Sequence, residues 1–141
     1  GGLFSQDGTR ANILIGRVDK ATGVKKFAVQ VLLHYSEDRR RKFESARSSR
    51  AEPLQLVKID QVRKNCVKRL DTCTFSEIVD VVIPESGLRG AGAEGYPIKL
   101  FARSGDTSII DIPRPVITSL LAKIDSDPAI ATAPARVSQS P

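Results

Sequence analysis

Residues 54–83 read LQLVKIDQVRKNCVKRLDTCTFSEIVDVVI and contain both cysteines of the chain, Cys66 and Cys73. The first part of this stretch, 54–64, and the last part, 74–84, are both rich in β-branched residues alternating with polar ones. A basic segment separates them. The pattern predicts two antiparallel strands joined as a hairpin, with one cysteine on each side of its tip.

The two cysteines admit three interpretations. They could form a disulfide across the mouth of the loop, since a disulfide needs Cα atoms roughly 4.4 to 6.8 Å apart, and each could equally reach a neighbouring subunit. They could also be small, buried, reduced thiols, as cysteines of cytosolic proteins usually are. Zinc is excluded, because it takes four ligands, the cysteine spacing is too long for a zinc knuckle, and His34 is the only histidine. We expect no metal and no other cofactor.

The length of 141 residues fits a single domain with an ordinary hydrophobic core. No stretch approaches the roughly 20 apolar residues of a membrane-spanning helix, and the first residues lack the basic region and long apolar segment of a signal peptide. We therefore expect a soluble protein that is made in the cytosol and has no membrane partner.

The net charge of +6 is concentrated in two segments. Residues 37–50 contain six Lys or Arg against three acids, and residues 58–69 contain five against one. Clustered basic surface is typical of a protein that binds a polyanion, most often nucleic acid. For residues 39–42 alone, a solvated loop explains the charge equally well. With five phenylalanines, two tyrosines and no tryptophan, stacking on bases is not expected to be the main source of affinity.

The N-terminal part predicts a second hairpin, with strands at 12–19 and 25–35 and Gly23 in the turn. Alternation within the second strand gives a core face of Phe27, Val29, Val31, Leu33 and Tyr35. The opposite face carries Ala28, Gln30, Leu32 and His34. His34 is therefore expected to be a surface or hydrogen-bonded strand histidine and not a ligand or a base.

Two connections follow from composition. Residues 36–53 are polar, arginine-rich and bounded by a proline, which predicts a long connection or an extension of the flanking strands. Residues 85–112 are expected to connect the sheet to a C-terminal helix. Within them, 90–95 match the dinucleotide fingerprint G-x-G-x-x-G, but Tyr96 and Pro97 follow where a helix should begin, so a surface loop is favoured. With no nucleophile motif and no convincing phosphate loop, no enzyme is expected.

The segment 113–141 is predicted to be helical with a tail. Apolar residues lie at i, i+3, i+4 and i+7 behind two prolines, which is the pattern of an amphipathic helix: Ile117, Leu120, Leu121 and Ile124. Asp127 and Pro128 suggest the start of a second short helix. The low-complexity tail, 129–141, is expected to bury little without a neighbour.

Strands in series, a hairpin loop flanked by two cysteines and C-terminal helices that close near residue 140 together resemble the coat proteins of the small single-stranded RNA bacteriophages. The resemblance covers residues 25–84 and 113–131. It implies one domain with an α+β fold, in which an N-terminal hairpin region (1–24) precedes an antiparallel sheet (25–84). It also implies that two subunits form an interlocked dimer whose continuous sheet faces the packaged RNA.

Several site residues follow from the resemblance. The loop 65–74 would surround the symmetry axes, and Cys66 and Cys73 would form disulfides between subunits after release from the reducing cytosol. The four apolar residues of the helix, Ile117, Leu120, Leu121 and Ile124, would clamp the dimer. The candidates for RNA contact come from the inward sheet face and from the two basic segments: Gln30, Leu32, His34, Arg39, Arg40, Arg41, Lys42, Lys58, Asp60, Arg63 and Lys64.

The expected function is therefore that of a non-enzymatic capsid protein. Its partners would be further copies of itself, which close an icosahedral shell with the T=3 arrangement usual in the family, and single-stranded genomic RNA. The virion would be assembled in the cytoplasm of a bacterial host, and RNA-hairpin binding with translational repression would be a further role. The alternative is a cellular basic RNA-binding module, associated with the ribosome or the nucleoid, that stays monomeric or dimeric.

Overall fold

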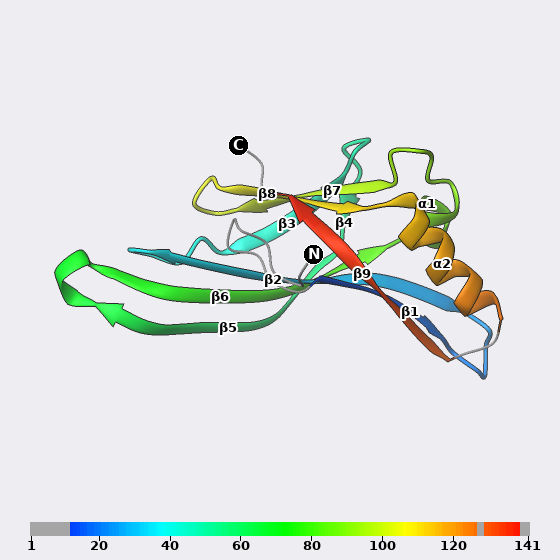
Figure 1. Ribbon diagram of the computed structural model, residues 1–141, viewed down its shortest axis with the longest axis horizontal. Helices are drawn as coiled ribbons and strands as arrows, with labels where there is room; N and C mark the ends of the chain where they lie inside the picture. The colour runs from blue at the N-terminus through cyan, green and yellow to red at the C-terminus, as the bar shows by residue number, and fades with distance from the viewer. Residues whose placement is uncertain (1–11, 127–128, 139–141) are drawn as a thin grey trace.

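Figure 1 shows the computed structural model, which describes residues 12–126 and 129–138. Its strands are β1 (Asn12–Val18), β2 (Lys25–Glu37), β3 (Phe43–Ser48), β4 (Pro53–Leu54), β5 (Leu56–Val67), β6 (Thr72–Ile83), β7 (Tyr96–Ala102), β8 (Thr107–Ile112) and β9 (Ile130–Ser138). The helices are η1 (Lys68–Leu70), α1 (Glu85–Arg89) and α2 (Arg114–Asp125). The coarse prediction of an α+β fold, dominated by antiparallel sheet, is confirmed.

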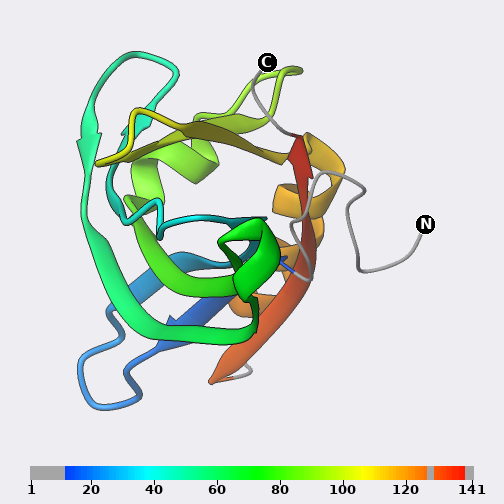
Figure 2. The ribbon, with the colours of Figure 1, turned by 90° about the vertical axis from the view of Figure 1, so that its left-hand side faces the viewer.

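All nine strands belong to one sheet, in the order β4-β3-β7-β8-β9-β1-β2-β6-β5. Only Gln55 separates β4 from β5, yet these two strands stand at opposite ends of that order. The sheet must therefore curl until its two ends meet, and Figure 2 shows the strands arranged around a common centre. The carbonyl of Gln55 accepts a hydrogen bond from the amide of Val82 (2.9 Å), which starts the pairing of β5 with β6.

The core lies inside this curl. It is built from alternate residues of the long strands, which is why the period of two predicted Phe27, Val29 and Val31 correctly as buried. Helix α2 covers the inside over β1 and β9 and adds Ile117, Leu120 and Ile124 to the core. It can approach closely because β1 has a glycine there: a Cβ on Gly16 would lie 2.8 Å from the Ile124 side chain.

Both predicted hairpins are present, as β1–β2 and β5–β6. Helix α2 also occupies its predicted place, with Pro115 in its first turn. Residues 90–95 form a loop, as predicted. The loop joins α1 to β7, so a strand and not a helix follows it directly.

Residues 36–53 are predicted to be a long connection or an extension of the flanking strands; β2 does extend to Glu37, but the rest of this prediction is wrong. They contain β3 and β4, and Phe43 and Ala46 are each 1% exposed. These two residues are three apart because the pairing of β3 with β7 shifts register between Phe43 and Ser45. Such a bulge breaks the period-two pattern, so the sequence shows no alternation there.

The prediction that residues 85–112 only connect the sheet to the C-terminal helix is also wrong in part, because this segment contains α1 and the strands β7 and β8. Ile98, Leu100, Ile110 and Ile112 of these strands are buried. The predicted tail is a strand as well: β9 lies between β1 and β8, with Ala131 and Ala133 buried. Of the second helix expected from residue 126, residues 127 and 128 lie outside the described part, and a strand begins at Ile130.

Candidate nucleic-acid and assembly interface

The hairpin of β5 and β6, with η1 at its tip, extends from one end of the molecule, on the left in Figure 1. We call it the arm. Strand β5 is exposed at every position after Leu56, and along its length it pairs only with β6 among the described residues. Six of the exposed side chains in the arm are large and apolar: Val57, Ile59, Val62, Val67, Leu70 and Val82. A long strand that buries nothing and ends a sheet is available to another molecule.

The cross-strand register assigns each side chain of the arm to one face of the sheet. Lys58, Gln61 and Arg63 stand opposite Val79, Glu77 and Phe75, which point into the core. They therefore lie on the inner face, the face turned toward the core. Val57, Asp60, Val62 and Lys64 stand opposite residues of β6 that point outward, so they lie on the outer face.

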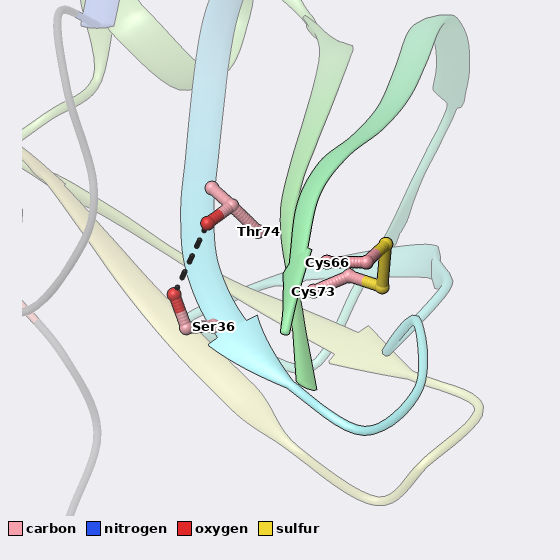
Figure 3. Close-up of a disulfide and its surroundings, with 4 residues drawn as sticks. All are labelled: Ser36, Cys66, Cys73 and Thr74. Atoms are coloured by element: carbon pink, nitrogen blue, oxygen red, sulfur yellow. Dashed lines mark hydrogen bonds between the residues drawn. A yellow bond between two sulfur atoms is a disulfide. The ribbon is translucent and has the colours of Figure 1, made fainter. Parts of the chain in front are cut away.

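The outer face presents polar side chains that are hydrogen-bonded to one another across the strands. Gln30 Nε2 donates to Asp80 Oδ1 (3.1 Å), and His34 Nδ1 lies 2.9 Å from Ser76 Oγ. Figure 3 shows the next such pair, Ser36 with Thr74, whose hydroxyl oxygens are 3.4 Å apart. The prediction of a hydrogen-bonded strand histidine is confirmed. Of the residues expected together on one RNA face, Gln30, Leu32, His34 and Asp60 are on this face, whereas Lys58 is on the other.

The inner face of the arm carries cations around one aromatic ring. Phe75 is 3% exposed, and the guanidinium carbon of Arg40, from the loop between β2 and β3, lies 5.5 Å from its ring centroid. Arg63 stands opposite Phe75 on β5. The Nε of Arg40 is shielded from solvent and has no hydrogen-bond partner. Arg40 thus lies against the ring, and Arg63 lies on the same face of the sheet at the position opposite Phe75.

Neighbouring cations on this side are already paired. Lys58 Nζ lies 3.9 Å from Glu44 Oε1, and the same oxygen lies 3.0 Å from Arg103 Nη2. Sequence reasoning did not identify Glu44 and Arg103, because their proximity to β5 depends on the curling of the sheet.

Arg41 is fixed by its own set of contacts. Its guanidinium lies over the ring of Tyr35, 4.3 Å from the centroid, and pairs with Glu37 and Asp106. The hydroxyl of Tyr35 donates to the carboxylate of Glu77, which is 1% exposed. Burial and this hydrogen bond raise the pKa of Tyr35 well above its usual value.

Glu77 also accepts hydrogen bonds from the backbone amides of Phe43 (2.9 Å) and Lys42 (3.2 Å). Lys42 has the left-handed φ of 63°, which these contacts hold in place. Arg39 remains exposed and lies 3.9 Å from Asp38. The four successive cations at 39–42 therefore have four different environments and do not form one patch.

Cys66 and Cys73 form a disulfide within the chain, seven residues apart, across the end of the hairpin (Figure 3). The resemblance implied a bond between subunits, and this pairing is corrected. The two strands bring both sulfur atoms to the same end of the arm, so each cysteine has its partner within reach in the same subunit.

The helix residues expected to clamp a dimer pack mainly within their own subunit. Ile117, Leu120 and Ile124 are at most 2% exposed, and Leu121 is partly buried against the same core. The dimer-clamping role therefore stays a prediction, and the dimer proposed below does not depend on it.

Within the described residues, no group of three or more His, Cys, Asp or Glu side chains could hold a metal ion. In the same part of the chain, no helix is long and apolar enough to cross a membrane. Comparison with protein-family models, curated proteins and solved structures finds no match to this chain.

Proposed function

We propose that this chain is a structural subunit that assembles with copies of itself, first as a dimer and then as an icosahedral shell around single-stranded RNA. The observation that supports self-assembly is the exposed strand β5. Its 12 residues span about 40 Å and leave one edge of backbone N–H and C=O groups without a strand partner in the described part of the chain. Natural proteins normally protect such edges. An unprotected edge with exposed apolar residues suits the addition of another strand.

A second copy is the partner that fits best. Two β5 strands related by a two-fold axis would pair antiparallel, each offering the same surface, as in most homodimers. Val57 and Val62 on the outer face would then be flanked by side chains of β6 on one side and of the partner strand on the other. The result would be a continuous sheet across two subunits, as the resemblance to phage coat proteins implies, without an exchange of α2.

RNA binding is supported by the placement of charge. The two basic segments identified in the sequence meet in the structure: residues 58–69 form most of β5 and η1, and the loop after β2 contacts Phe75 of β6. Cations gathered at one end of a molecule release counterions when phosphates replace them. In the proposed shell this end would face the packaged RNA, and the protein would reside in the virion.

Assembly is tested directly by expressing the chain in bacteria and examining the purified material by sedimentation and electron microscopy. We expect regular closed particles that contain RNA. Material that sediments only as a small species, at every salt concentration and with RNA supplied, would overturn the capsid proposal.

The contribution of β5 is tested by Val62→Lys, which places a charge in the proposed interface. We expect the particles to be lost, because the charge would lie in the row of side chains where the two β5 strands meet and would repel the same charge of the second copy. The melting temperature of the subunit should change little, since Val62 is already 40% exposed. Ile130→Lys is the matched control: Ile130 is 56% exposed but belongs to β9, so this variant should still assemble.

A cellular RNA-binding module is the second candidate, since a basic arm can bind RNA without assembling. The same sedimentation experiment separates the two functions. A monomer or dimer that binds RNA and never forms particles would favour the module.

A further inference from the structure

We propose that the RNA backbone binds on the inner face of the arm, with its phosphates at Arg40 and Arg63 beside Phe75, and not on the outer face of the sheet. This inference rests on the proposed RNA binding and specifies where it occurs. Sequence reasoning grouped Arg63 and Lys64 as equivalent candidates, whereas the structure places these adjacent cations on opposite faces of β5.

Arg40 is prepared for an anion. Its guanidinium is held against Phe75, and its Nε is buried without a hydrogen-bond acceptor. No carboxylate of the described residues forms an ion pair with it, in contrast to Arg41 and Arg103. A guanidinium that stacks on a ring keeps donors at its edge, in the planar geometry that matches a phosphate.

Arg63 supplies the second cation. It stands directly opposite Phe75 in the register of β5 and β6, its side chain is exposed, and it has no ion pair with the described residues. Lys58 lies on the same face but is shared with Glu44 (3.9 Å). Arg40 and Arg63 are therefore the cations near Phe75 on the inner face that form no ion pair with a described carboxylate.

The outer face of the arm is less suited to phosphate. Asp60 lies there, and so does Asp80, whose carboxylate accepts the hydrogen bond from Gln30. These two acids outnumber Lys64 on the same part of the sheet. Their repulsion disfavours a polyanion on this side.

A single strand fits the inner face better than a duplex. The side chain of Arg40, from the β2–β3 loop, lies over Phe75 on this face, so an approaching nucleic acid must pass beside the loop. A flexible single strand can adapt its backbone to such a cationic surface, largely without regard to sequence.

The test measures the binding of a fluorescently labelled oligouridine to the full chain by anisotropy, over a series of salt concentrations. The variants are Arg63→Ala and Arg40→Ala, with Lys64→Ala as the matched control in the same strand. Each phosphate contact of a single strand contributes about 0.7 to the slope of log affinity against log salt. We expect both arginine variants to bind more weakly and to lose about 0.7 of that slope. Lys64→Ala should bind like the unsubstituted chain.

Folding is checked for each variant by its thermal melt. Arg63 is exposed, so Arg63→Ala should melt like the unsubstituted chain. Arg40→Ala removes the contact with Phe75 and could lower the melting temperature. In that case the comparison of Arg63→Ala with Lys64→Ala still tests the proposal.

The possible outcomes are distinct. If the chain binds oligouridine and Lys64→Ala weakens binding as much as Arg63→Ala, the inner-face assignment is wrong while RNA binding stands. If the unsubstituted chain binds no RNA, the RNA part of the proposed function fails as well. Equal affinity for polyglutamate and oligouridine would overturn RNA as the specific ligand.

Discussion

Glu77 is a carboxylate on a strand face that is otherwise apolar, and the structure explains why it is there. Its oxygens accept hydrogen bonds from the hydroxyl of Tyr35 and from the amides of Lys42 and Phe43. These contacts connect the middle of β6 to the start of β3. The residue thus fixes the loop that positions Arg40.

Replacing this carboxylate should be costly. Glu77→Ala would leave two amides and a hydroxyl unsatisfied in the interior, which we expect to lower the free energy of unfolding by about 3 kcal/mol. Tyr35→Phe removes one hydrogen bond to Glu77 and also the acceptor of the Arg41 amide (2.8 Å), and should cost about 2 kcal/mol. Urea denaturation with unchanged m values would give both numbers. Equal stability of Glu77→Ala and the unsubstituted chain would refute the structural role of this cluster.

At the scale of the element, strand β5 of the arm is held by its pairing with β6 and by the disulfide, and not by burial of its side chains. Strand β5 buries no side chain completely, so the link between Cys66 and Cys73 is what closes the tip. In the chain-entropy model a loop of this length gains about 2.5 kcal/mol from closure.

We expect reduction, or the Cys66→Ser/Cys73→Ser double variant, to accelerate hydrogen exchange in β5 while the core strands β7 and β8 remain protected. Non-reducing electrophoresis of oxidised particles should give monomers, because the bond is internal. A ladder of covalent multimers in that gel would show instead that the cysteines pair between subunits.

At the scale of the whole molecule, one ion-pair cluster connects distant parts of the chain. Asp125 at the end of α2 accepts hydrogen bonds from Arg89 of α1 (2.8 and 3.0 Å) and from Lys25 at the start of β2 (2.8 Å). Arg89 also pairs with Glu85. Hydrogen bonds from Arg89 and then Lys25 hold the pKa of Asp125 well below its ordinary value of 3.8.

A carboxylate with a lowered folded-state pKa stabilises the fold above its unfolded pKa, and this contribution is lost as the pH falls through the folded value. The melting temperature should therefore fall below about pH 4, and Asp125→Asn should show a smaller fall. Salt should weaken the difference, because the cluster is exposed. The same acid dependence in the variant and the unsubstituted chain would contradict a role for Asp125.

Period-two alternation was enough to predict the two hairpins, and i, i+3, i+4 spacing was enough for α2. Strand β3 was not predicted because its bulge places the buried residues Phe43 and Ala46 three residues apart. Strand β9 was not predicted because its buried residues are alanines within a low-complexity tail. The arginines at 39–41 look alike in sequence, yet only contacts made by the curled sheet distinguish paired Arg41 from unpaired Arg40. The local sequence pattern likewise did not decide whether each cysteine pairs within the chain or with another subunit.

The bulge in β5 has a further consequence. The register shifts between Lys58 and Asp60, so Ile59 has no partner of its own in β6. A ladder that paired Ile59 with Ile78 would reverse the parity of every later residue, turning Lys64 inward and Arg63 outward. One extra residue in β5 therefore places Arg63 on the inner face and Lys64 on the outer face. Related chains could lengthen β5 before these residues by an even number of residues without exchanging the faces on which they lie.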